Sequence, residues 1–248
     1  MIASAVASSL SLNDRVVELL RSVDYRRADS ADDREAIYRL RYDAYLRGGE
    51  IPPSFSRRFT DRVDDDDNTW NFGVRIDGLL AGSIRLSVTI PGCRRLPALG
   101  VFSDFLLPQI EAGKTIVDPT RFVADRASSR RHPELPYVVL RIPWIAMTYF
   151  KADLMLAAIR AEHQAFYRRM WGCRVVCPPR PYPALRSHIS LLTCEHAAVK
   201  DEVHRRYPFF QSDPVERTLL FERKPRVQET GSKRDISQAS SGPPVGAS

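Results

Sequence analysis

The sequence predicts an α/β fold, more closely an α+β arrangement in which one mixed, twisted sheet has helices on both faces. Three observations predict it. The 248 residues are 44% apolar, which is enough for a sizeable core. Apolar residues recur with helix and strand periods in alternation along the chain. An apolar strand over residues 114–124 contains a proline, which predicts a bulged central strand.

The first half of the chain predicts two helices and a hairpin. Ser30 or Asp32 begins the second helix as its N-cap, and Gly48-Gly49 ends it. Asp77-Gly78 is a tight-turn signal between two alternating apolar runs. The helices are expected over 10–23 and 30–49, the strands over 24–28, 70–76 and 79–88, and loops over 50–68 and 91–113.

The second half predicts alternating helices and strands. Pro143 is expected to interrupt a helix, and Pro178-Pro179 to end a strand. The strands are expected over 114–124, 153–159, 173–177, 187–192 and 217–223, the helices over 136–151, 161–170 and 194–206, and a loop over 125–132. Residues 1–223 should form a single domain with an N-terminal helical extension (1–23). The Ser/Gly/Pro-rich residues 224–248 should be a disordered tail.

Asp118 and Arg121 are charged residues inside the apolar run of the central strand. Side chains three positions apart on a regular strand point to opposite faces. Pro119 lies between the two and predicts a bulge, which re-aims side chains and is common beside active sites. We expect a kinked strand that presents Asp118, Arg121 and free backbone N–H groups to a cleft. The alternative is an ordinary surface ion pair on an edge strand.

Other charged residues fall at inward positions. Arg41 lies along the apolar stripe of its helix, so it needs a carboxylate or phosphate partner unless it extends to solvent. Arg85 alternates with small residues on the polar face of its strand, which looks like one wall of a cleft. The acidic run 61–67 either places carboxylates near that cleft or forms a solvated turn.

The net charge of +7 favours an acidic partner and makes a basic nucleic-acid-binding protein the non-enzyme alternative. Because the arginines are dispersed and no nucleic-acid-binding signature appears, we expect no nucleic acid partner. No apolar run is long enough to span a membrane, and no basic residue precedes the apolar N-terminus, so we expect a cytoplasmic protein. We also expect a monomer, although none of these features determines the oligomeric state. The spacing of Cys173 and Cys177 is unlike a zinc site, and we expect no metal.

Four blocks in order resemble the acyl-homoserine-lactone (autoinducer) synthases and the related N-acyl amino acid synthases. They are Arg39–Tyr45, Asp61–Thr69, Gly82–Leu86 and Val117–Phe122. The resemblance covers roughly residues 24–151 and implies the GNAT acyltransferase fold. It implies catalytic roles for Asp118 and Arg121, and substrate binding by Arg41, Tyr45, Asp61, Asp64 and Arg85. The expected bulge adds Thr120 to the catalytic residues and Phe122 to the substrate-binding residues.

The sequence departs from the family at two positions. Asp118 stands where the family usually has glutamate, and Glu50-Ile51 stand where it has a tryptophan. The missing tryptophan and the long segment after residue 151 favour an N-acyl amino acid synthase over an acyl-homoserine-lactone synthase that uses S-adenosylmethionine. The expected reaction moves a fatty acyl group from a thioester to the α-amine of an amino acid. Asp118 would be the base, and a backbone N–H near Thr120 to Phe122 would stabilise the oxyanion.

The loop after the central strand suggests the acyl donor. Residues 125–132 contain Arg126, Arg130 and Arg131 but no glycine, whereas a coenzyme A cradle usually needs glycines for close backbone approach to the pyrophosphate. The resemblance therefore implies an acyl carrier protein as partner, with its acyl-phosphopantetheine thioester as donor and no tightly bound cofactor. Acyl-CoA is the alternative donor, and a CoA-dependent GNAT acetyltransferase is the alternative enzyme.

Overall fold

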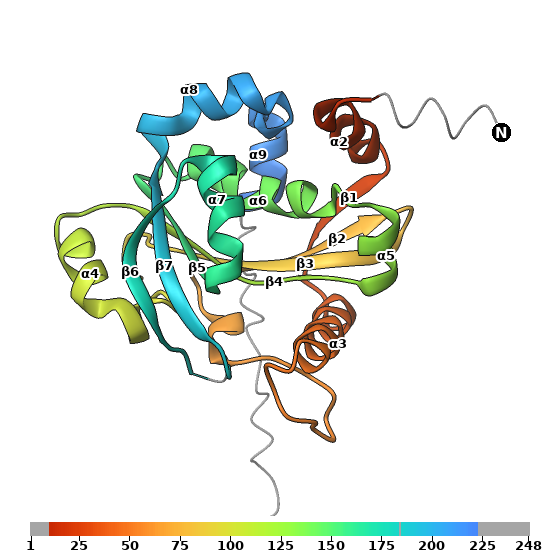
Figure 1. Cartoon of the computed structure of the whole chain (residues 1–248), viewed down its shortest axis with the longest axis horizontal. Coiled ribbons are helices and arrows are strands. Elements are labelled where there is room, and N and C mark those ends of the chain that lie inside the picture. The colour runs from red at the N-terminus through yellow and green to blue at the C-terminus, as the bar shows by residue number, and fades with distance from the viewer. Residues whose placement is uncertain (1–9, 184, 223–248) are drawn as a thin grey trace, which may run out of the picture.

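The computed structural model describes residues 10–183 and 185–222, which form one mixed sheet covered by helices (Figure 1). In this part of the chain the seven strands lie in the order β1-β2-β3-β4-β5-β7-β6. They are β1 (Val23–Arg27), β2 (Thr69–Ile76), β3 (Leu79–Val88), β4 (Ile116–Ala124), β5 (Leu154–Ile159), β6 (Arg174–Pro181) and β7 (His188–Glu195). Only the β4–β5 pair is parallel. The predicted mixed sheet is confirmed.

Helices cover both faces of the sheet. The main core lies under α2 (Leu12–Leu20), α6 (Leu135–Tyr149), α7 (Gln164–Trp171), α8 (His196–Arg206) and α9 (Pro214–Phe221). The other face carries α3 (Ala31–Arg47) and α4 (Leu99–Glu111), with separate apolar clusters beneath them. The short α5 (Arg126–Arg131) connects β4 to α6. A polar strip of the sheet is therefore left between α3 and α4.

Three predicted segments have a different structure. Residues 217–221 of the predicted strand 217–223 belong to the helix α9 and not to a strand, because Asp213 caps the N-terminus and Pro214 fits the first helical turn. The expected loop 91–113 contains α4, whose Phe102, Leu106 and Ile110 bury one helical face. The expected loop 125–132 contains α5, which is capped by the Asp125 side chain.

Prolines disrupt the structure less than predicted. Pro143 lies inside α6, which continues from Leu135 to Tyr149. A proline inside a helix costs about 3 kcal/mol, but its neighbours Ile142 and Trp144 are completely buried, and this packing keeps the helix intact. Strand β6 continues past Pro178-Pro179 because it lies at the edge of the sheet, where a proline need not donate to a further strand.

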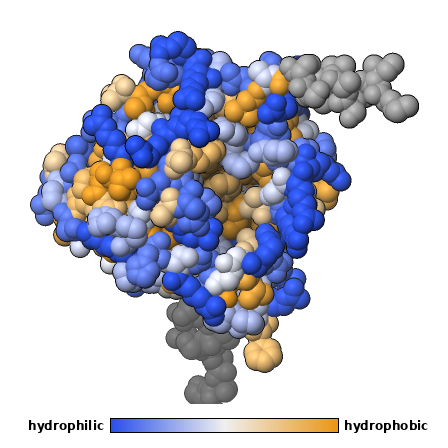
Figure 2. All heavy atoms as spheres, viewed as in Figure 1, coloured by the Kyte–Doolittle hydropathy of each residue, from blue (hydrophilic) through white to orange (hydrophobic). Residues whose placement is uncertain are grey.

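Strands β4 and β5 separate soon after they begin. They pair only at Ile116 with Leu154 and at Val117 with Met155. Beyond these residues, β4 faces β5 without strand pairing, and Figure 2 shows a hollow with a hydrophobic floor beside α7 in this region of the surface. The predicted disordered tail, 224–248, lies outside the described residues.

Candidate active site

Arg41 of α3 is completely buried on the polar strip. Its Nη1 donates to Asp64 Oδ1 at 2.7 Å, and its Nη2 donates to Asn71 Oδ1 at 2.6 Å. Burial alone would raise the pKa of Asp64, but the charges of Arg41 and Arg85 outweigh burial and lower it. The prediction of a carboxylate partner for Arg41 is confirmed.

Asp61 joins two strands through two arginines. Arg85 Nη1 of β3 donates to Asp61 Oδ1 at 2.6 Å, and Arg121 Nη2 of β4 donates to Asp61 Oδ2 at 2.7 Å. Burial raises the pKa of Asp61, yet both arginines lower it more, to about 2. The acidic run is therefore not a solvated turn. It contains the short 3₁₀ helix η1 (Arg62–Asp65), with Asp61 as its cap.

A bulge in β4 brings Arg121 to this network. Ser83 pairs with Val123 and Arg85 pairs with Thr120, so one residue of β3 opposes two of β4. Arg121 takes a left-handed conformation there, with φ of 55°. Strict alternation would place the side chains of Arg85 and Arg121 on opposite faces of the sheet. The bulge places them on the same face, where both donate to the Asp61 carboxylate. A bulge in this strand is confirmed, but it lies at Arg121 and Phe122, and Pro119 itself pairs in register with Leu86.

Aromatic rings surround the Arg121 guanidinium. Its carbon lies 4.2 Å from the ring centroid of Phe59 and 5.6 Å from that of Tyr45. Burial lowers the pKa of Arg121, but its interactions with Tyr45 and Asp61 outweigh this and raise it. Next to it, the Thr120 hydroxyl accepts a hydrogen bond from Arg85 Nε at 3.0 Å. The bulge therefore holds the Arg121 guanidinium beside the rings of Phe59 and Tyr45.

Asp118 is completely buried on the same face but is not in an ion pair with Arg121. Its Oδ2 accepts a hydrogen bond from the Ala98 N–H at 2.9 Å, and its Oδ1 has no hydrogen-bond partner among the described residues. Burial raises the pKa of Asp118 to about 7, although the Ala98 N–H and the charge of Arg85 oppose this. A carboxyl group with a near-neutral pKa can exchange a proton at physiological pH.

Sequence reasoning missed three residues of this face. Asn71 lies opposite Arg85 in the β2–β3 register, and strand alternation could have placed it there. No feature of the sequence indicated that Phe59 belongs to the site. Tyr182, half-buried after β6, also lies close: burial and the charge of Asp118 raise its pKa, while Arg121 and Arg85 oppose this. Only tertiary structure brings Tyr182 across from the far edge of the sheet.

Two groups of predicted residues lie elsewhere. Phe122 packs against the main core, on the α6 side of the sheet and away from the arginine network. Arg126, Arg130 and Arg131 are exposed on α5, and none forms an ion pair with another described residue. Because α5 follows β4 directly, these arginines lie close to the end of β4 that has separated from β5.

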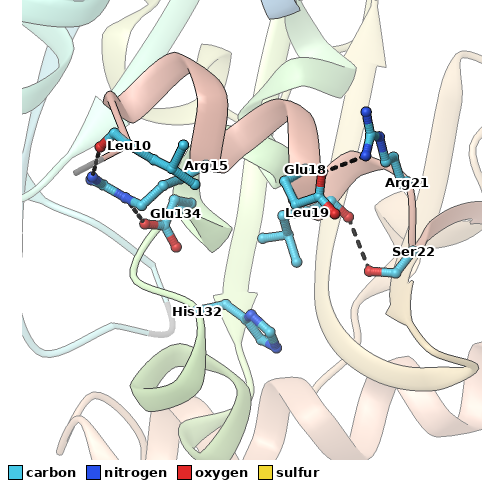
Figure 3. Close-up of a pocket in the computed structure, with 8 residues that line it drawn as sticks. All are labelled: Leu10, Arg15, Glu18, Leu19, Arg21, Ser22, His132 and Glu134. Atoms are coloured by element: carbon cyan, nitrogen blue, oxygen red, sulfur yellow. Dashed lines mark hydrogen bonds and ion pairs between the residues drawn. The ribbon is translucent and has the colours of Figure 1, made fainter. Parts of the chain in front are cut away.

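A pocket of about 400 Å³ lies between α2 and the start of α6 (Figure 3). Leu10, Leu19 and His132 are among the residues that line it, and an ion pair of 2.6 Å joins Arg15 to Glu134 at one side. None of the network residues lines this pocket. In the described ranges, no three His, Cys, Asp or Glu side chains are grouped to hold a metal ion. Nor does any helix there have the length and apolar character to cross a membrane.

Comparison with solved structures shows the fold. The structure of FeeM, an N-acyl amino acid synthase from uncultured soil microbes, aligns with a TM-score of 0.61 at 17% identity, over 72% of this chain and 93% of that one. The structure of TofI, in a complex with an inhibitor and MTA, aligns with a TM-score of 0.53 at 17% identity, over 72% of this chain and 96% of that one. The structure of BjaI, a CoA-dependent acyl-homoserine lactone synthase, aligns with a TM-score of 0.51 at 14% identity, over 75% of this chain and 89% of that one. The chain has the GNAT-like acyltransferase fold.

The family follows from the sequence profiles. No curated protein matches the chain. The profile of the N-acyl amino acid synthase FeeM matches residues 36–195, well over half of the chain. This range contains most of α3, the acidic run, β3 and the bulge of β4, which together build the arginine network. The chain is therefore an acyltransferase that belongs to the FeeM family of N-acyl amino acid synthases.

Proposed function

We propose that the protein transfers a fatty acyl group from an acyl carrier protein thioester to the α-amine of an amino acid. The observation that carries this proposal is Asp118, a buried carboxyl group with a pKa of about 7, on the sheet face where β4 separates from β5. A base of this kind is what an amine nucleophile needs near neutral pH.

The reaction has one bond to form and one to break. The α-amine attacks the thioester carbonyl carbon, and a C–N bond forms in a tetrahedral intermediate. Asp118 accepts the amine proton, directly or through a water molecule. When the C–S bond breaks, the phosphopantetheine sulfur leaves with its electron pair and takes up a proton to become a thiol. No other reactant is needed.

The bulge of β4 is suited to stabilise the oxyanion. Backbone N–H groups between Thr120 and Phe122 lie where the ladder with β3 is irregular and where β5 no longer pairs. In well-studied enzymes one such donor lowers the barrier by roughly 3–4 kcal/mol. The separated strands also leave room for the acyl-phosphopantetheine arm, with Phe122 on the apolar side.

The arginines divide into two roles by burial. Arg41 and its partner Asp64 are buried and hydrogen-bonded to each other, whereas Asp118 has one unpaired oxygen, so we assign Arg41 and Asp64 to holding the acidic segment in place. Arg121 keeps 10% of its side chain exposed and lies beside Tyr45, so it is our candidate for the acceptor carboxylate. Arg85 and Asp61 orient it.

In this proposal the α5 arginines bind the acyl donor. Arg126, Arg130 and Arg131 are exposed beside the separated end of β4 and would hold the phosphate of the phosphopantetheine arm. Acyl-CoA carries the same phosphopantetheine, so a CoA donor is the competing form of the proposal. An acyl-homoserine lactone synthase reaction, with S-adenosylmethionine as acceptor, competes on the acceptor side.

One assay tests donor and acceptor together. The enzyme is incubated with dodecanoyl groups loaded on an acyl carrier protein, on coenzyme A or on pantetheine, and with a panel of amino acids and S-adenosylmethionine. We expect N-acyl amino acid by mass spectrometry, and one thiol released per product, with the carrier as the best donor. Lactone formed only from S-adenosylmethionine, or no amide product from any donor, would overturn the proposal.

A further inference from the structure

Two cysteines face each other where β6 begins and β7 ends. In the antiparallel β6–β7 register, Arg174 pairs with Thr193, and continuing this register by one position places Cys173 opposite Cys194. Directly opposed residues of an antiparallel pair have Cα atoms about 4.5–5.5 Å apart, and a disulfide spans Cα atoms about 4.4–6.8 Å apart. The backbone therefore holds the two cysteines at a separation that a disulfide can bridge.

The two thiols are free, buried and in contact. Cys173 is 4% exposed and Cys194 is 3% exposed. A hydrogen bond with Cys173 and, next, burial raise the pKa of the Cys194 thiol. The structure describes all four cysteines of the chain, and only these two belong to the same apolar cluster: Cys177 lies in the cluster under α4, and the half-buried Cys93 lies in neither cluster. Cys173 and Cys194 are therefore the cysteines placed to bond to each other.

One of the two thiols has a route to solvent. A shallow groove of about 790 Å³ lies between α7 and the start of β6, and its lining residues include Cys173 but not Cys194. Gly172, which follows the end of α7, is exposed and has no side chain to cover its neighbour. Arg168 and Arg174 line the same groove and attract anionic molecules. A small anionic disulfide therefore reaches Cys173 first.

The cysteine pair lies in one row with the point where β4 and β5 separate. Cys194 pairs with Met155 of β5, and Met155 pairs with Val117 of β4. This is the last pair before the two strands separate, and Asp118 is the next residue of β4. Cys173, Cys194, Met155 and Val117 all belong to the main core. A bond between the two sulfurs therefore acts on a row of packed residues that ends beside the candidate base.

We infer that Cys173 and Cys194 form a redox-sensitive dithiol, which closes to a disulfide and braces the row at which β4 and β5 separate. The oxidant is a low-molecular-weight disulfide. The Cys173 sulfur attacks one sulfur of glutathione disulfide and forms a mixed disulfide, and one glutathione leaves as a thiol with the Cys173 proton. The Cys194 sulfur then attacks the Cys173 sulfur, and the second glutathione leaves with the Cys194 proton. Two protein thiols are oxidised, and one external disulfide is reduced to two thiols.

Titration with glutathione buffers of increasing oxidised fraction tests the inference without an acyl substrate. We expect the wild type to lose two of its four thiols, to give a Cys173–Cys194 cross-link in the peptide map, and to regain both thiols with dithiothreitol. Tm should rise by roughly 5 °C or more, because the cross-link closes the β6–β7 hairpin and constrains the unfolded chain. Hydrogen exchange should slow in β5 around Met155, which pairs with Cys194.

Single variants separate the roles of the two thiols. Cys194→Ala should stop after the first step and retain glutathione on Cys173, whereas Cys173→Ala should leave Cys194 unreacted, since Cys194 does not line the groove. The double variant Cys93→Ala, Cys177→Ala removes both other thiols and should close as the wild type does.

Cross-links to Cys93 or Cys177, equal modification of all four thiols, or a folded wild type that stays reduced in glutathione disulfide alone would overturn the inference. A Cys173–Cys194 disulfide that leaves both Tm and the exchange of β5 unchanged would also overturn it, because the bond would then brace nothing.

Discussion

Arg121 Nη2 donates a hydrogen bond to Asp61 Oδ2 at 2.7 Å. This contact joins the segment that follows α3 to the bulge of β4, two parts of the chain 60 positions apart. Because the other oxygen of Asp61 accepts from Arg85, the carboxylate is held in two directions and fixes the guanidinium of Arg121 beside Phe59. The position of the cation therefore depends on the acidic segment as much as on the strand that carries it.

Asp61→Asn should reduce acyl transfer while the protein stays folded. Losing hydrogen bonds to charged donors costs about 1.5–3 kcal/mol, which corresponds to a fall in kcat/KM of roughly 10- to 100-fold. The control is Asp65→Asn in the same 3₁₀ segment, because the exposed Asp65 forms an ion pair with the half-buried Arg34 and none with Arg121. Equal activity of the two variants would show that Asp61 does not position Arg121.

Asp118 should govern the pH dependence of activity. If it is the base, kcat/KM rises with pH and levels off above about 7, where Asp118 is ionised in the folded protein. Asp118→Asn should remove this rise and lower kcat/KM by about 10²- to 10⁴-fold. A variant that retains the wild-type profile would exclude Asp118 as the base.

The same residue should make the protein less stable as pH rises. Because burial raises the pKa of Asp118 from its usual 3.8 to about 7, the folded state binds this proton more tightly than the unfolded state. Its contribution is present below pH 4 and is lost between about pH 4 and 7, on the order of 4 kcal/mol for a shift of about three units. Urea unfolding of the wild type and Asp118→Asn across this range measures it, and parallel pH curves would contradict it.

Arg41→Met should destabilise the protein severely. It removes a buried charge but keeps an apolar chain of similar length, and it leaves Asp64 buried without its main partner. Breaking such a pair costs roughly 3–5 kcal/mol, or about 10 °C in Tm for a domain of this size. Arg39→Met on the same helix removes only an exposed pair with Glu35 and should change stability by less than about 1 kcal/mol. A Tm loss no larger than that of the control would contradict the structural role.

Gly82→Ala should distort the bulge of β4. An added Cβ would lie 3.0 Å from the Val123 carbonyl oxygen and 3.1 Å from Val139 Cγ2. Both distances are shorter than an ordinary contact, so the backbone of β4 would have to shift. We expect a loss of about 1–3 kcal/mol in stability together with lower kcat, because Val123 adjoins the bulge. Gly100→Ala meets no atom within 4 Å and should be neutral or slightly stabilising. Differential scanning calorimetry and the transfer assay report both effects.

The α5 arginines should act on donors that carry a phosphate. Reversing Arg126, Arg130 and Arg131 to glutamate should raise KM for acyl carrier protein far more than it lowers kcat, and small thioesters without carrier or phosphate should react almost as before. The effect should shrink in high salt, since the Debye length falls from about 10 Å at 0.1 M to about 3 Å at 1 M. Equal losses for carrier and small thioesters would instead make α5 part of the active site.

Local signals in the sequence determined much of the fold. Alternation and the Asp77-Gly78 turn predicted the β2–β3 hairpin, because these features depend on backbone preferences of a few adjacent residues. Pro119 between two charged residues predicted a bulge in β4, although the bulge lies at Arg121 and Phe122. The prediction of a strand over 217–223 was wrong because it was based on these residues alone. Its residues have no decisive local preference, and the cap that starts α9 precedes them.

What tertiary structure alone decided is which charged side chains meet. The sequence by itself determined that Arg41 lies on an apolar stripe and that the central strand carries Asp118 and Arg121. It did not determine that Arg121 pairs with Asp61 while Asp118 turns to the Ala98 N–H, or that Tyr182 approaches from the far edge of the sheet. Partner choice among several arginines and carboxylates depends on distances and burial between distant segments, and those exist only after the sheet has assembled.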